Sequence, residues 1–177
     1  MVLILQGCKI ITIKKEREKK NKLKPTTKYF TEYMNNMSEE SCKIVDKIIK
    51  GDFNYVLNKM CNIQSNNVYI DHLYFKHLAT KNTYPIIQQY VSHLLNTILN
   101  EHGHFIVHVN LNKLTLSDFD KHKDFIKSVS MLLKDTYPDK LKLCYVYNAP
   151  IFFSQIYNFV GLFIDKETLS KVQLLKT

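Results

Sequence analysis

The sequence is poor in the residues that build flexible linkers, disulfides and phosphate-binding turns. It has only four glycines and four prolines, which argues against a low-complexity chain. No glycine-rich phosphate loop follows any predicted strand, so a nucleotide-binding protein is disfavoured. The four cysteines form no CxxC pair, which disfavours a zinc ribbon or a thioredoxin-like site. Scattered single thiols are typical of a reducing compartment, and we therefore expect a cytoplasmic protein.

Long apolar runs and catalytic motifs are missing as well. No segment approaches the roughly 20 apolar residues of a membrane span. The opening stretch MVLILQGCKIITI has no charged region before its apolar run, which is unlike a signal peptide. There is no GxSxG motif and no local cysteine–histidine pairing, so we expect no enzyme. His102, His104 and His108 have no acidic or thiol partner nearby in the sequence, so we expect no metal and no cofactor.

Positive charge is abundant but unevenly distributed. The formal net charge is +9, yet residues 1–24 carry eight basic and two acidic side chains. The remaining residues are only mildly basic. We therefore predict a basic, disordered extension over residues 1–36 and a single domain over residues 37–177. A nucleic-acid-binding role for residues 9–24 is a weak alternative, because no base-reading motif accompanies them, and we expect no specific nucleic-acid partner.

The remaining sequence alternates between helical and strand patterns. A helix is predicted from Ser38 to Gly51, and a short second helix after Asp52. Residues 61–67 are polar and are predicted to form a loop, and residues 68–71 a short strand. Further helices are predicted from Pro85 to about residue 99, and after a cap at Ser117 with Asp120 three residues later.

Three strands are predicted in the C-terminal half, over residues 105–111, 141–147 and 172–175. They alternate with helices, which predicts an α/β fold with a mainly parallel sheet flanked by helices. The segment 151–164 is predicted to be a helix with too little polar surface for an ordinary surface helix. Without neighbouring motifs, a buried core helix would be the preferred interpretation of this segment.

The sequence around that helix resembles the CRAL-TRIO lipid-binding domain, the family of phosphatidylinositol/phosphatidylcholine transfer proteins. The resemblance rests on the runs YPDKL, YVYNAP and FIDKETLSKV, together with the aromatic helix between the last two. It covers residues 137–172 and extends back to about residue 104. The family usually continues beyond the lysine of the last motif, so the resemblance implies a fold without the usual C-terminal extension.

The resemblance also implies a site and a mechanism. In family members that carry phosphatidylinositol, the headgroup is held by side chains that match Asp139, Thr168 and Lys171. A lysine and a threonine suit the phosphodiester, and a carboxylate accepts from ring hydroxyls. Asp139 is one methylene shorter than the family's glutamate. The helix over residues 151–164 matches a gate over the lipid pocket, and its predicted gate or acyl-chain contacts are Phe152, Phe153, Ile156, Phe159, Val160 and Phe163.

These features predict a monomer that binds and transfers or presents a phospholipid at a membrane surface, to which it attaches transiently and peripherally. Hydroxyl side chains that contact phosphatidylcholine in the family correspond to Phe105 and Val107, which cannot donate a hydrogen bond. Phosphatidylinositol or a phosphoinositide is therefore the favoured ligand, and no other cofactor is expected. The alternative is a protein-interaction or scaffold module of the same fold that has lost its lipid.

Overall fold

The computed structural model describes residues 37–175. The chain divides into two compact units, one ending at Val56 and the other starting at Leu57, and each is described by itself. The predicted extension over residues 1–36 lies outside the described residues, so the predicted domain limits stay predictions.

The described part of the first unit consists of helix α3 (Glu39–Ile49) and the start of α4 (Phe53–Met60). Ser38 caps α3, because its side-chain oxygen accepts a hydrogen bond from the Ser41 backbone at 3.3 Å. Two glutamates in the first turn favour the same helix end. Gly51 follows the helix with a φ of +83°, a conformation that glycine adopts without strain. Both helices lie where the sequence predicts them.

The second unit is built on a five-stranded sheet in the order β1-β2-β3-β4-β5. The strands are β1 (Cys61–Gln64), β2 (Asn67–Asp71), β3 (Phe105–Asn110), β4 (Leu141–Tyr147) and β5 (Val172–Leu175). Strands β1 and β2 pair antiparallel, and the other neighbouring pairs are parallel. The predicted mainly parallel α/β fold is confirmed.

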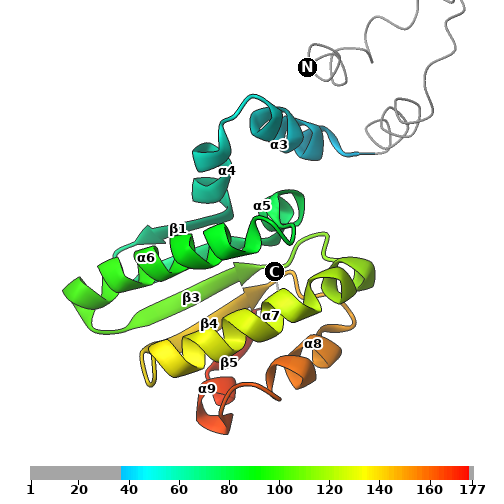
Figure 1. Ribbon diagram of the computed structural model, residues 1–177. Coiled ribbons are helices and arrows are strands. Elements are labelled where there is room, and N and C mark those ends of the chain that lie inside the picture. The colour runs from blue at the N-terminus through cyan, green and yellow to red at the C-terminus, as the bar shows by residue number, and fades with distance from the viewer. Residues whose placement is uncertain (1–36, 176–177) are drawn as a thin grey trace, which may run out of the picture. The chain divides into compact units, whose positions relative to one another are not determined.

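Five helices connect or follow these strands: α5 (His72–Leu78), α6 (Tyr84–His102), α7 (Leu116–Thr136), α8 (Phe153–Val160) and α9 (Lys166–Ser170). Figure 1 shows α6 and α7 running side by side across one face of the sheet. Tyr84 of α6 packs on Phe125 of α7, with ring centroids 4.5 Å apart, and Gln88 hydrogen-bonds with Ser128 at 2.9 Å. Among the strand side chains that face these helices, Val68 and Val146 are buried.

Alternate side chains of the strands point to the opposite face of the sheet and form a polar and aromatic cluster. His108 of β3 stacks on Tyr69 of β2 with ring centroids 4.7 Å apart. Its Nδ1 lies 2.8 Å from the Tyr147 hydroxyl and its Nε2 lies 3.0 Å from Oδ1 of Asn67. The two faces of the sheet therefore differ in chemistry, because this cluster lies on the face opposite Val68 and Val146.

Several element boundaries differ from the sequence predictions. Residues 61–64 are predicted as loop but form edge strand β1. The hairpin turn at Ser65 brings these four residues, two of which are polar, against β2. Helix α7 is capped by Thr115 with Asp118, two residues before the predicted cap at Ser117. Helix α8 spans 153–160 and is shorter than the predicted 151–164, because turns occupy both ends of that segment.

Candidate functional site: an apolar cavity beside helix α8

A cavity of about 260 Å³ lies between the sheet and helices α5 to α8. Its floor includes Ile70 of β2 and Val109 of β3, which are opposite each other in the parallel register. Branched and aromatic side chains of α6 and α7 supply most of the remaining wall. Walls of this kind favour apolar ligands, because transfer of each methylene group from water contributes about 0.8 kcal/mol.

Helix α8 closes one side of this cavity through Ile156. Phe159 of α8 packs edge to face on Phe119 of α7, with centroids 5.5 Å apart, and contacts Phe163 at 5.1 Å. No residue of α8 is buried, whereas α6 and α7 each contain buried core residues.

A second hollow, an open groove of about 880 Å³, lies between α8 and strand β5. It is lined by Phe153 and Tyr157 of α8 and by Leu174 and Leu175 of β5, among others. Near it, Ile151 is fully exposed to solvent. Helix α8 thus borders the apolar cavity with Ile156 and the open groove with Phe153 and Tyr157.

The end of α8 is fixed by a close approach to α9. A methyl group in place of the Gly161 hydrogen would lie 2.9 Å from Cδ2 of Leu169, so alanine at this position would require the Leu169 side chain to shift. The Tyr157 hydroxyl also donates to the Leu169 carbonyl oxygen at 3.4 Å. These contacts connect the C-terminal half of α8 with α9.

Polar groups in the cavity are few, and two of them are histidines. His72 follows β2 and His122 lies on α7, and their side chains are 6% and 2% exposed. Nδ1 of His122 lies 2.7 Å from the Tyr84 hydroxyl. Burial lowers the pKa of both imidazoles, so they are uncharged at neutral pH. Burial also raises the pKa of the Cys61 thiol to about 12, so this wall residue remains protonated.

The residues predicted to hold a headgroup lie outside the cavity wall. Thr168 and Lys171 are one turn apart at α9, and the Thr168 hydroxyl donates to Asp165 at 2.7 Å. Lys171 is 19% exposed and its Nζ lies 3.2 Å from a carboxylate oxygen of Glu167. Asp139 lies in the exposed turn before β4 with a φ of +59°. Because β4 and β5 are parallel neighbours, all three residues lie toward the N-terminal edge of these strands.

The predicted gate residues divide among different surroundings. Ile156 is the member that lines the cavity, whereas Phe153 lines the outer groove. Phe159 and Phe163 form the ring contacts next to α7. Phe152 stands at the N-terminal cap of α8 and Val160 is its last residue. Sequence reasoning missed the cavity walls on α6 and α7 and the two buried histidines, for which the chain offers no short motif.

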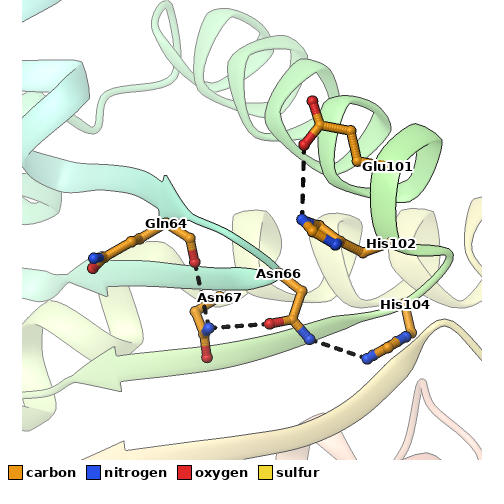
Figure 2. A network of polar contacts seen from close by, with 6 residues as sticks. All are labelled: Gln64, Asn66, Asn67, Glu101, His102 and His104. Atoms are coloured by element: carbon orange, nitrogen blue, oxygen red, sulfur yellow. Dashed lines mark hydrogen bonds and ion pairs between the residues drawn. The ribbon is translucent and has the colours of Figure 1, made fainter.

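Three histidines considered as metal ligands have separate partners (Figure 2). Nε2 of His102 lies 3.7 Å from Glu101, and Nε2 of His104 lies 3.0 Å from the Asn66 side chain. His108 belongs to the cluster with Tyr147 and Asn67. Within residues 37–175, no group of three or more histidine, cysteine, aspartate or glutamate side chains has the arrangement of a metal site.

Among the same described residues, no helix combines the length and the apolar character needed to cross a bilayer. The apolar segment 151–164 contains helix α8, which has only eight residues.

Comparisons with known proteins point to one family. The CRAL/TRIO domain model matches residues 53–177. The SEC14 cytosolic factor of Yarrowia lipolytica is 28% identical over 91 residues, which are 49% of this chain and 18% of that protein. The crystal structure of Sfh5 has a TM-score of 0.55 at 15% identity, covering 76% of this chain and 56% of that chain. The chain therefore spans about half of the solved relative and under a fifth of the curated one, and the structural likeness confirms the predicted fold.

Proposed function

Because the chain belongs to the CRAL/TRIO domain family, we propose that it binds a phospholipid and transfers or presents it at membranes. Phosphatidylinositol or a phosphoinositide is the proposed ligand, and the role is binding, without catalysis. One observation carries the proposal: α8 has a hollow on each side. Ile156 faces the cavity, while Phe153 and Tyr157 line the outer groove. Displacement of α8 would therefore join the two hollows into a space for a larger ligand.

The energetics of such a displacement are moderate. The ring contact between Phe119 and Phe159 contributes about 0.5–1.5 kcal/mol beyond its buried area. Burial of an exposed aliphatic side chain contributes about 1.5–3 kcal/mol. Ile151 is fully exposed and Leu162 is 75% exposed, so their insertion into a bilayer would offset the loss of contacts between α7 and α8. This balance supports opening of α8 at a membrane surface and closure in water.

We place the headgroup of the ligand at Thr168 and Lys171, with Asp139 contacting ring hydroxyls. The ammonium group of Lys171 pairs with the exposed carboxylate of Glu167, which a phosphodiester could replace. Thr168 already donates to Asp165, so it would have to change partner on binding.

Uptake from vesicles tests this proposal. The protein is incubated with phosphatidylcholine vesicles with and without phosphatidylinositol and is then re-isolated. Native mass spectrometry measures the mass of the protein together with any bound lipid. Lys171→Ala should reduce phosphatidylinositol uptake about tenfold, because a charge-assisted hydrogen bond contributes roughly 1.5–3 kcal/mol. Lys166→Ala, an exposed lysine on the same helix, is the matched control. Equal uptake of phosphatidylinositol by both variants would show that Lys171 does not bind the headgroup.

A second candidate function is supported by strand β5. It forms one edge of the sheet, and Leu174 and Leu175 are exposed there beside the groove. Such an edge can accept an extended peptide as an additional strand. A protein that takes up no phospholipid from either vesicle would favour this interaction role.

A further inference from the structure

Strand β5 forms an edge of the sheet, where only β4 among the described strands pairs with it. Cys144 of β4 lies opposite Val172, and its backbone N–H donates to the Lys171 carbonyl oxygen at 2.9 Å. In a parallel ladder with this register, every second residue of β5 turns its backbone groups toward β4. The N–H and C=O groups of Val172 and Leu174 therefore point away from the sheet.

These outward groups lack partners within residues 37–175, where no hydrogen bond to the backbone of Val172 or Leu174 is formed. Edge strands of natural proteins are usually protected by a charged residue, a proline or a covering segment. Strand β5 has the sequence VQLL and carries neither a charge nor a proline. Its Leu174 and Leu175 are exposed. The edge is therefore a template for a further strand.

The groove between α8 and β5 continues this edge. Val172 and Leu174 line the groove with their side chains, and Ile151 at its border is fully exposed. Alternate side chains of a strand share a face, so a strand added to β5 would place every second side chain beside the groove. Backbone and side chains of β5 thus favour the same partner, an extended strand with apolar residues at alternate positions.

Strand β5 itself meets this requirement. In an antiparallel pair of two β5 strands, Val172 can lie opposite Leu174 of the second copy, and both residues then direct their backbone groups toward each other, as a hydrogen-bonded pair requires. Gln173 lies opposite the second copy's Gln173, and two such amides can hydrogen-bond. Lys171 lies opposite Leu175, so the paired residues 171–175 bring no like charges together.

We propose that the chain forms a two-fold symmetric dimer through antiparallel pairing of β5 with β5 of a second copy. The two-fold axis is perpendicular to the joined sheet, because paired residues of an antiparallel ladder direct their side chains to the same face. Helix α8 packs on α7, so both copies of α8 lie on one side of the joined sheet. The dimer can therefore present both helices to one membrane surface.

This inference goes beyond the proposed function and needs no bound lipid. It replaces the monomer expected from the sequence. Specific interfaces usually bury about 1,200–2,000 Å² in total, and two strands of four residues alone offer less, so side chains at the groove such as Ile151 have to contribute. We therefore expect a weak dimer with a dissociation constant of about 10–100 µM. Sedimentation velocity of the full-length protein at increasing concentration measures it.

A disulfide tests the register of the pair. Gln173 is exposed and lies at the proposed two-fold axis, where opposite Cα atoms are about 4.5 Å apart, a distance that a disulfide can span. Gln173→Cys, in a Cys8→Ser background, should form a covalent dimer under mild oxidation above the dissociation constant. Asn62→Cys in the same background is the matched control, because Asn62 is exposed on β1 at the other edge of the sheet. It should cross-link much more slowly.

A proline tests the backbone pairing. Leu174→Pro removes an outward N–H and leaves the ladder between β4 and β5 intact, because the N–H at this position does not face β4. The variant should dimerise about tenfold more weakly or less, since the dimer loses two hydrogen bonds. Leu174→Val keeps the N–H and an apolar side chain, and it should dimerise within about twofold of the unaltered protein.

A protein that stays monomeric up to about 500 µM would overturn the inference. Equal cross-linking of Gln173→Cys and Asn62→Cys would also overturn it. Neither result depends on Leu174→Pro, so both decide the question even where that substitution impairs folding. A monomer that binds an extended peptide at β5 would assign the edge to a different partner and would overturn the dimer.

Phospholipid uptake, measured separately, distinguishes this inference from the proposed function. A monomer that takes up phospholipid from vesicles would overturn the dimer alone. A dimer that takes up none would overturn the proposed function alone.

Discussion

Acidification should destabilise the second unit at a pH well above that at which carboxylates titrate. The responsible group is His77 of α5. Burial lowers the pKa of His77 to about 4 from a usual value of 6.5. Nearby Lys76 and Lys121 act in the same direction, His72 adds to it, and Asp118 opposes it. The folded protein therefore keeps His77 uncharged at a pH where the unfolded chain would protonate it.

The sign and size of the effect follow from proton linkage. Because the unfolded state binds the proton more readily, stability is complete above about pH 6.5 and is lost as the pH falls toward 4. For a pKa shift of this size, the loss between pH 7.5 and pH 5 is about 2 kcal/mol. Since His77 is only partly buried, solvent screening reduces the expected loss to about 1 kcal/mol. His72 and His122, whose pKa values are also lowered, act in the same direction.

Urea unfolding at fixed ionic strength measures this loss. Far-ultraviolet circular dichroism is the suitable signal, because the chain contains no tryptophan. The free energy of unfolding is determined at several values between pH 7.5 and pH 5 for the unaltered protein and for His77→Gln. The variant cannot take up the proton, so its stability should fall by about 1 kcal/mol less over the same interval. His93→Gln controls for the replacement of an exposed histidine.

Either of two results would contradict a lowered pKa of His77 in the folded protein. One is a stability that stays constant from pH 7.5 to pH 5 in the unaltered protein. The other is a histidine titration by NMR in which the His77 pKa lies at or above 6.5, because the fold would then bind the proton as readily as the unfolded chain does.

Other substitutions test individual contacts by chemical denaturation. Thr115→Ala should lower stability by about 1 kcal/mol through loss of the α7 cap, whereas Ser117→Ala should have little effect; the reverse order would refute the assigned cap. Phe119→Ala should cost about 3–5 kcal/mol, with the exposed Leu116→Ala as control, and a cost below 1 kcal/mol would contradict its place in the core. His72→Phe should lower stability by no more than about 1 kcal/mol, because the phenyl ring keeps the apolar packing and only the hydrogen bond of the imidazole with the Asn112 backbone is lost; a larger loss would contradict this.

The sequence predicts the parallel strands better than the edge of the sheet. Strands β4 and β5 span the predicted residues, because turn residues border β4 and both segments are apolar. Strand β1 could not be predicted, since two of its four residues are polar and its extended conformation depends on pairing with β2. The cap of α7 illustrates a different limit: Thr115/Asp118 and Ser117/Asp120 have the same spacing, and only the fold distinguishes them.

The site could be predicted only in part. A pattern of apolar residues shows that a face of α6 or α7 is buried, but it does not show whether the facing surfaces leave a space between them. His72 and His122 are 50 positions apart, and no local motif connects them. Conversely, the motif that supplied Thr168 and Lys171 identified two neighbouring residues on α9, but the contacts of Thr168 with Asp165 and of Lys171 with Glu167 became visible only in three dimensions.

The order of strands across the sheet matches their order along the chain. A growing polypeptide could therefore assemble this architecture one layer at a time, each emerging strand joining the margin left by its predecessor, without insertion between strands already paired. Domains generally fold from the N-terminal side during synthesis, at about 5–20 residues per second. On a ribosome, the β1–β2 hairpin would provide the template, and β5 would complete the assembly as the last strand to join.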